Sequence, residues 1–298
     1  MRLSLLRRTR EDIVMDTVIF TVLIIMFLLT AYPFYLSIVL SFNEGIDAAR
    51  GGIYFWPRKF TVQNYLSFFQ DNRWLNGFII SVVRTFIGTV VTTIFTAMVA
   101  YGLSFRNLMY RKFYLGLVIF CMYFNGGLIP YYVTLRMVGL INNFWVYIIP
   151  QALNLFYVIV AISFFQEIPQ ELHESAKLDG AGEIAVLSRI YLPLSLPLLA
   201  TIAIFAGVGH WSAWFDSAFF IRDNNLRTLG YLLMEVINKS NANTSLSAMA
   251  ATAQSGIAIT PMSVQVTAMV IAVVPIMLIY PFLQKYFVTG LTLGSVKG

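Results

Sequence analysis

Glu174-Ser175-Ala176-Lys177-Leu178-Asp179-Gly180, followed after nine residues by Ile190-Tyr191-Leu192-Pro193, is the most informative stretch of this chain. It belongs to a polar segment, residues 166–191, that separates two long apolar runs. The segment carries five acidic and two basic residues, a formal charge of −3. Acidic loops gain nothing from anionic lipid, so we expect another protein surface, of basic character, to bind this segment.

The polar segment predicts two short helices joined by a tight turn. Pro169 suits the first turn of a helix, where its missing N–H costs nothing. Glu171 and Glu174 then lie near the positive end of that helix, which favours carboxylates. Gly180 supplies the positive φ that ends the helix and reverses the chain. A second helix is expected over residues 183–190.

The composition is that of an all-α integral membrane protein. Of the 298 residues, 58% are hydrophobic and only 11% are charged, whereas soluble domains carry roughly 25% charged residues. Apolar runs of about 20 residues, the length that crosses a bilayer, recur along the chain. The alternation over roughly ten residues that marks membrane β-barrels is not seen. The net charge of +6 sits mainly in short flanks and loops, so it does not indicate nucleic-acid binding.

We expect one transmembrane domain, residues 1–298, with six spans and both termini in the cytoplasm. Pro33 in the first span, and Pro193 and Pro197 in the fifth, should kink or start helices, which membrane helices tolerate. The spans are expected at Thr17–Leu40, Gly77–Leu103, Phe113–Ile129, Phe144–Phe165, Leu192–Phe215 and Val264–Phe282, with the polar segment 166–191 as a cytoplasmic loop.

Lysine and arginine residues orient these spans. With the N-terminus inside, the cytoplasmic segments hold 11 of them and the outside segments hold 8. Four arginines precede the first span, where positive charge weighs most. Residues 43–76 and 223–263 then face outward. The first apolar stretch, 24 residues long, is too long for the core of a cleaved signal peptide.

The pattern E-[AS]-A-x3-G-x9-I-x-L-P in the polar segment resembles the EAA loop of bacterial ABC importer permeases, which receives the ATPase subunit. Ser175 stands where the pattern usually has alanine. The resemblance implies that Glu174 makes an ionic contact to the ATPase and that Gly180 sets the shape of a rigid knob. The alternative is an ordinary polar loop with a helix stop at Gly180. The residues assigned to ATPase coupling in this way are Glu171, Glu174, Ser175, Ala176, Asp179, Gly180, Ala181, Ile190, Leu192 and Pro193.

The resemblance extends over nearly the whole chain. Stretches similar to the MalG-type carbohydrate permeases are Tyr32-Pro33-Phe34, Phe55-Trp56-Pro57, Asn64-Tyr65 and Ala100-Tyr101-Gly102-Leu103-Ser104. Stretches similar to the branch typified by LplC and YtcP are Phe124-Asn125-Gly126-Gly127-Leu128-Ile129-Pro130, Gly209-His210-Trp211, Tyr280-Pro281-Phe282-Leu283-Gln284-Lys285-Tyr286-Phe287 and Gly294-Ser295-Val296-Lys297-Gly298. The branch implies complex oligosaccharides as cargo, including uronic ones such as alginate or pectin fragments.

The family also implies an assembly around this chain. The chain would have the type I ABC importer permease fold, in a bacterial inner membrane, as one half of a permease heterodimer. Its partners would be a second permease, two ABC ATPase subunits, an extracytoplasmic solute-binding protein and an oligosaccharide. The ATPases would bind ATP and Mg²⁺, so we expect no cofactor and no catalysis in this chain. Lys297 would have a contact role toward the ATPases; the alternative is a disordered terminus.

Five residues are candidates for the sugar path. Arg84 lies some 10 Å deep in its span, at roughly 1.5 Å per residue, and an intramembrane arginine is a functional candidate by default. It would meet an acidic sugar or a carboxylate such as Asp216; a structural ion pair is the alternative. His210, Trp211 and Trp214 add rings that could stack on sugars, although Trp also belongs at membrane interfaces for other reasons.

Other chemistry is not indicated. The sequence has no G-x4-G-K-[ST] loop for ATP and no H-E-x-x-H, and two histidines with one cysteine, Cys121, argue against a metal site. An ion-driven secondary transporter is a rival, but it would want charged midmembrane residues and inverted repeats. A membrane-embedded enzyme and a permease for peptides or other small solutes are the remaining alternatives.

Overall fold

Helices make up the structure of this chain in a computed structural model that describes the backbone of residues 10–242 and 260–293. The arginines before Arg10 and the tail with Lys297 lie outside the described residues. The chain divides into two compact units, one of Met1–Phe68 with Lys239–Ile271 and one of Phe69–Asn238 with Ala272–Gly298.

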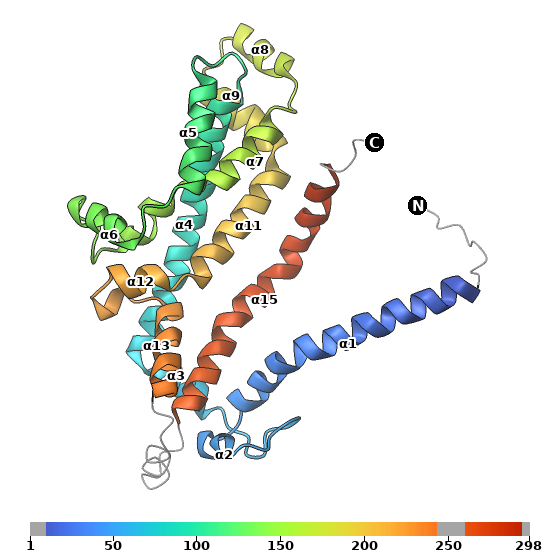
Figure 1. The fold of residues 1–298 in the computed structure, drawn as a ribbon, viewed down its shortest axis with the longest axis vertical. Helices are drawn as coiled ribbons and strands as arrows, with labels where there is room; N and C mark the ends of the chain where they lie inside the picture. The colour runs from blue at the N-terminus through green and yellow to red at the C-terminus, as the bar shows by residue number, and fades with distance from the viewer. Residues whose placement is uncertain (1–9, 243–259, 294–298) are drawn as a thin grey trace. The chain divides into compact units, whose positions relative to one another are not determined.

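The helices follow one another along the chain as shown in Figure 1. They are α1 (Arg10–Ser41), α2 (Gly45–Ala49), α3 (Gln63–Gln70), α4 (Asn72–Ser104), α5 (Arg111–Tyr123), α6 (Leu128–Met137), η1 (Phe144–Tyr147), η2 (Ile149–Gln151), α7 (Leu155–Phe165), α8 (Gln170–Leu178), α9 (Glu183–Val186), η3 (Leu187–Tyr191), α10 (Leu192–Leu194), α11 (Leu196–Ser212), α12 (Phe215–Phe220), η4 (Asn224–Leu226), α13 (Leu229–Ala242) and α15 (Pro261–Leu293).

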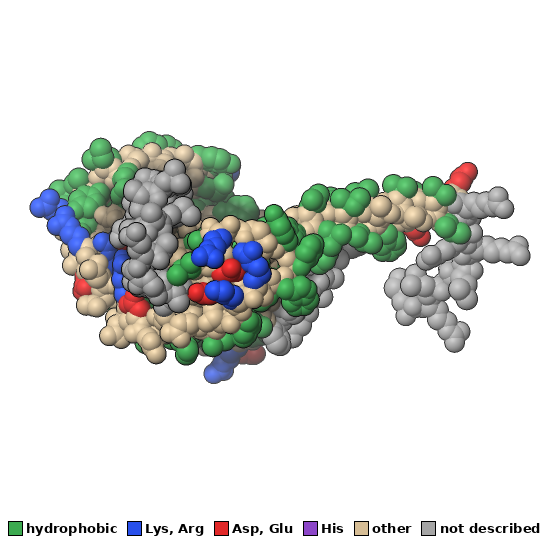
Figure 2. Space-filling view, turned by 90° about the horizontal axis from the view of Figure 1, so that it is seen from below, with side chains coloured by type: hydrophobic (Ala, Val, Ile, Leu, Met, Phe, Trp, Pro, Cys, Tyr) green, Lys and Arg blue, Asp and Glu red, His purple; other side chains and the backbone are tan. Residues whose placement is uncertain are grey.

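The first unit consists of a long apolar helix followed by a group of hydrogen-bonded polar residues. The apolar window of α1 has none of its residues buried, and Figure 2 shows hydrophobic side chains along its length. At its end, Asp47 accepts hydrogen bonds from Asn43 at 3.0 Å and from Arg58 at 3.1 Å. Asn64 donates to the carbonyl oxygens of Ser41 and Asn43, both at 2.9 Å. These bonds, together with buried apolar side chains such as Ile53 and Phe68, hold the chain after α1 in place.

The second unit is built around α4 and α11. The face that α4 buries carries small or polar residues at helical spacing, among them Gly88, Thr92 and Thr96. A Cβ atom at Gly88 would lie 2.5 Å from Nε2 of His210, so the two helices meet closely at this point. Small residues at such contacts are what membrane helices use to pack, because lipid supplies no hydrophobic drive between them.

Breaks divide most of the apolar runs. Only α1, from Glu11, and α4 are long and apolar enough to cross a membrane unaided, and the described residues hold up to five spans if each bent pair counts as one. The bent pairs turn by 115° between α5 and α6, 43° before α7 and 85° before α11. The sixth expected span, Val264–Phe282, falls within α15, in which the described residues Met262–Leu278 form an apolar helix.

The breaks have identifiable causes. Pro193 and Pro197 lie at the starts of α10 and α11, as expected of residues that begin helices. The span expected at 113–129 ends instead at Tyr123, and Gly127, with φ +83°, redirects the chain into α6. Glycine adopts this left-handed conformation without steric cost. The apolar run therefore folds as two helices rather than one.

Candidate functional site

The turn after α8 has the geometry of a glycine-terminated helix. Gly180 has φ +81°, and its N–H bonds to the carbonyl of Lys177 at 3.0 Å. The N–H of Ala181 bonds to the carbonyl of Ala176 at 2.9 Å, which completes a Schellman motif. The positive φ predicted at Gly180 is confirmed, and the turn is fixed by backbone bonds rather than left as an open loop.

A carboxylate that the sequence did not single out holds the two short helices together. Glu183 accepts from Lys177 at 2.7 Å on one oxygen and from the hydroxyl of Tyr101 at 2.5 Å on the other. Nε2 of His173 lies 3.3 Å from the second oxygen. Lys177, and then Tyr101, hold the pKa of the Glu183 carboxyl down at about 2. Glu183 thus ties α8 and α9 to α4.

Contacts between aromatic rings also connect the two short helices to the apolar helices next to them. Tyr101 packs edge-on against Tyr191 at 4.8 Å and against Phe105 at 5.0 Å between ring centroids. Phe165 meets Tyr191 edge-on at 5.6 Å. The ring of His173 lies 4.8 Å from that of Phe105. Offset and edge-on pairs of this kind add to the stability of a core. We call residues 170–191, which these contacts hold, the knob.

The knob presents a distinct outer surface. Leu178 is 89% exposed and Ile184 is 83% exposed, which is unusual for large apolar side chains next to a packed cluster. The exposed acidic side chains of Glu171, Glu174 and Asp179 have no hydrogen-bond or ion-pair partner among the described residues. Apolar groups and free carboxylates on one rigid segment can bind a partner that supplies both an apolar and a cationic surface.

The ten predicted coupling residues, eight in the knob and two directly after it, divide into an outward and an inward set. The outward set is exposed and comprises Glu171, Glu174, Ser175, Asp179, Gly180 and Pro193. The inward set packs on the core of the second unit and comprises Ala176, Ala181, Ile190 and Leu192. Glu183 and Tyr101 were missed because they lie 82 residues apart, and no local pattern connects them.

The second group of predicted residues forms a buried polar cluster. Arg84 is fully buried and forms an ion pair with Asp216. Its guanidinium donates to the carbonyl of Ala213 at 3.2 Å and lies 4.5 Å from the ring centre of Tyr147. Gln151 donates to the same carboxylate at 2.7 Å. The structure thus brings Arg84 and Asp216 together, as an internal ion pair.

The remaining members of that group differ in exposure. His210 is only 3% exposed and lies 3.4 Å from the hydroxyl of Thr92. Trp211 donates from Nε1 to the carbonyl of Ala272 at 2.9 Å. Trp214 is 38% exposed. Among the five predicted residues, Trp214 is the exposed one and Trp211 is partly exposed, so these two are the residues that a ligand could meet directly.

The described residues offer no metal site. Within residues 10–242 and 260–293, no group of three His, Cys, Asp or Glu side chains lies close enough to hold an ion. Cys121 is exposed and free. The knob and Trp214 are exposed and could contact a partner or a ligand.

Comparison with known proteins gives a consistent result. Residues 89–292 match the family described as "Binding-protein-dependent transport system inner membrane component". The chain is 39% identical to "Protein LplC" of Bacillus subtilis (strain 168), over 91% of this chain and 90% of that protein. It is 34% identical to "Polygalacturonan/rhamnogalacturonan transport system permease protein YtcP" of the same organism, over 95% and 98%.

A solved structure has the same fold. It is the "Crystal structure of a bacterial ABC transporter involved in the import of the acidic polysaccharide alginate". One of its chains matches with a TM-score of 0.85 and 26% sequence identity. The match covers 94% of this chain and 99% of that chain. The fold described above is therefore that of a transporter subunit in a solved assembly.

Proposed function

This chain belongs to the family of binding-protein-dependent transport system inner membrane components, and from this we propose that it is the permease subunit of an ATP-driven oligosaccharide importer. The names of its relatives support the cargo, since they include permeases for polygalacturonan or rhamnogalacturonan, arabinooligosaccharides and melibiose, raffinose or stachyose. The solved relative is involved in the import of alginate, an acidic polysaccharide, which supports uronic oligosaccharides in particular.

The knob is the observation that carries the proposal. Its Schellman turn and the Glu183 contacts fix its shape, while Leu178, Ile184 and the free carboxylates stay available. The proposed occupant of this surface is an ATPase subunit, with Glu174 in ionic contact with a basic group of the ATPase. The polar loop alternative would need no such exposed apolar side chains.

The proposed mechanism is alternating access. ATP binding closes the two partner ATPases and moves the knobs seated on them. The Glu183–Tyr101 bond passes this movement to the end of α4, so the spans swing and the cavity opens toward the loaded binding protein. Hydrolysis resets it. ATP and Mg²⁺ stay on the ATPases, and this chain changes shape without performing covalent chemistry.

The proposed setting is a bacterial inner membrane with six spans and both termini in the cytoplasm. The partners are a second permease, two ATPases and an extracytoplasmic solute-binding protein. The fully exposed apolar window of α1 supports this setting, because such a surface needs lipid or another membrane helix around it.

Affinity purification of the tagged chain from its host, in mild detergent, tests the proposal. We expect a second permease and an ATPase to co-purify, and binding-protein-dependent uptake of oligosaccharide after reconstitution. The binding protein is then screened against neutral and uronic oligosaccharides of equal length. A chain that purifies alone and catalyses uptake alone would instead be a secondary transporter.

A further inference from the structure

In the membrane setting proposed above, helix α6 lies near the level where the bilayer meets water. It leaves α5 at 115°, as Figure 1 shows, and its residue Leu135 belongs to a buried cluster that packs against Ile80 and Ile87 of α4. Counting from Ser104, the other end of α4, a hydrocarbon core of about 30 Å at about 1.5 Å per residue ends near residue 84. The level of α6 is therefore the outer boundary of the core.

One exposed face of α6 carries both apolar side chains and an arginine. Ile129, Val133 and Met137, spaced four residues apart, form an apolar stripe and are 77%, 44% and 83% exposed. Tyr132 and Arg136 follow Ile129 and Val133 by three residues, so they lie beside the stripe on the same face. Apolar side chains next to an arginine suit the interface between acyl chains and headgroups, because the charged group can reach the headgroups.

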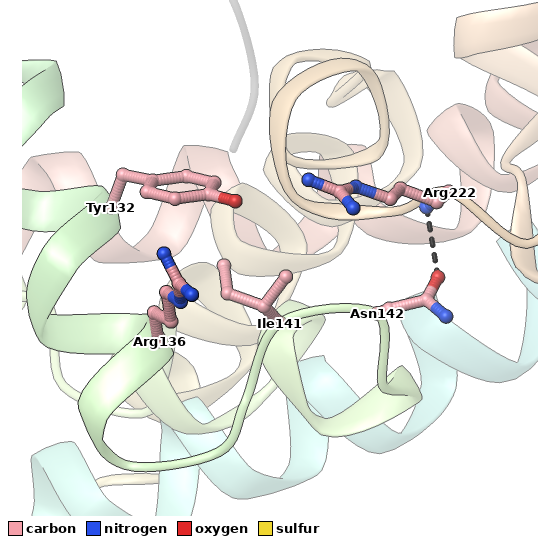
Figure 3. A pocket seen from close by; sticks show the side chains of 5 residues that line it. All are labelled: Tyr132, Arg136, Ile141, Asn142 and Arg222. Carbon is pink, nitrogen blue, oxygen red and sulfur yellow. Dashed lines mark hydrogen bonds between the residues drawn. The ribbon is translucent and has the colours of Figure 1, made fainter.

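Tyr132 and Arg136 of α6 line a pocket, shown in Figure 3. Its volume is about 270 Å³. We call it the arginine pocket; it is lined by Tyr132, Arg136, Ile141, Asn142 and Arg222. Arg136 comes from α6 and Arg222 from the segment after α12, so two parts of the chain supply the positive charge.

Backbone bonds fix the frame of the arginine pocket. Oδ1 of Asn142 accepts from the N–H groups of Arg222 and Asp223, both at 2.8 Å. The N–H of Asn142 bonds to the carbonyl of Phe220 at 2.8 Å. Asn142 itself has φ +58°, a conformation that asparagine tolerates better than most residues. The two walls of the arginine pocket are therefore held together before any ligand arrives.

The charges of the arginine pocket are uncompensated within the described residues. Neither Arg136 nor Arg222 has a carboxylate partner there. The nearest acid in sequence, Asp223, instead accepts from the N–H of Asn225 at 2.9 Å. Guanidinium groups match phosphate oxygens in two parallel hydrogen bonds, which makes phosphate a well-suited anion.

We propose that the arginine pocket binds the phosphate of an anionic phospholipid headgroup from the outer leaflet. The exposed stripe of Ile129, Val133 and Met137 lies beside it at the level of the acyl chains, which a free anion or a sugar would not use. The bound lipid anchors α6 against the segment after α12. The proposal rests on the chain being a membrane-spanning permease, as proposed above.

Native mass spectrometry of the purified transporter tests the proposal. Phosphatidylglycerol and phosphatidylcholine are added, and the lipid retained on this subunit is measured. We expect wild type to retain phosphatidylglycerol, and R136Q/R222Q to bind it roughly 30-fold more weakly. R50Q, which removes an exposed arginine elsewhere, should match wild type. The double variant R136K/R222K keeps the positive charge and should bind phosphatidylglycerol with intermediate strength. Lipid binding by this variant would show that replacing the two arginines does not by itself unfold the pocket.

Two competing ligands, inorganic phosphate and trigalacturonate, test whether the arginine pocket binds a lipid, a free anion or a sugar. Displacement of the lipid by inorganic phosphate at equal concentration would overturn the lipid assignment in favour of a free-anion site. Displacement by trigalacturonate would overturn it in favour of a sugar site. Equal lipid retention in wild type and R136Q/R222Q would overturn the site altogether. The lipid measurement is made on this subunit itself. Its failure can therefore be distinguished from a failure of the ATPase co-purification that tests the proposed function.

Discussion

The knob and the Arg84–Asp216 pair place charge in opposite ways. In the knob, the side chains of Glu171, Glu174 and Asp179 are exposed without partners among the described residues. Inside the second unit, Arg84 is fully buried and its carboxylate partner Asp216 is also held by Gln151. Unpaired charge at a rigid surface is available to another protein, whereas paired charge inside a bundle serves the fold. The difference distinguishes the proposed coupling residues from residues that stabilise the fold.

The largest effect is expected from breaking the buried pair. Asp216→Ala leaves the guanidinium of Arg84 buried without its counter-charge, so we expect a loss of about 3–5 kcal/mol in the free energy of unfolding. Thermal unfolding in detergent measures it. The double variant Arg84→Met/Asp216→Ala should recover much of the loss, because no lone charge remains. Equal stability of wild type and the single variant would show that Arg84 is not dependent on this carboxylate.

A smaller effect on stability, but a complete effect on partner binding, is expected at the turn of the knob. Gly180→Val forces a side chain into φ +81°, at a cost of about 1–2 kcal/mol or more. We expect the ATPase no longer to co-purify. Gly182→Ala is the matched control, because Gly182 has φ −74° and open space around it. Gly180→Asn should also retain the ATPase, and its loss there would contradict the conformational argument.

Tyr101→Phe tests whether the knob is coupled to α4, because it removes the hydroxyl that donates to Glu183. The loss of this bond should cost about 1 kcal/mol. We expect the ATPase still to co-purify, since the outer surface of the knob is unchanged, but less sugar to be transported per ATP hydrolysed. Tyr114→Phe, on exposed α5, is the control. An unchanged ratio of transport to hydrolysis would show that Tyr101 does not pass movement to α4.

The smallest effect is a pH dependence of the knob. The pKa of Glu183 is lowered in the folded chain from 4.5 to about 2, so the charged form is favoured by folding. This contribution is complete above pH 4.5 and is lost as pH falls from 4.5 toward 2. The size is modest because Glu183 is about half exposed. Proteolysis of the loop against pH measures it, and Glu183→Gln should remove the dependence.

The sequence predicted those features that local chemistry determines. Gly180 as a left-handed turn and Pro193 and Pro197 as helix starts needed only the preferences of those residue types. The contact between Arg84 and Asp216 was predictable as one option, because an intramembrane arginine needs a counter-charge. Its burial supports the structural alternative, and a role in the sugar path stays a prediction.

Features that depend on distant residues were not predictable. Glu183 lies in a polar loop where water would satisfy it, so nothing in the sequence required the bond to Tyr101. The span expected at 113–129 also failed to foresee the bend at Gly127. Asn125, Gly126 and Gly127 interrupt the apolar run with residues typical of turns, and the packing of Leu135 against the cluster near α4 holds α6 in its new direction.

The close contact between α4 and α11 has a consequence for how this chain can vary in nature. A Cβ atom at position 88 would collide with the ring of His210, which is itself buried. Any residue larger than glycine at 88 therefore requires a smaller one at 210. We therefore expect the two positions to change together, or to stay as they are, among natural variants.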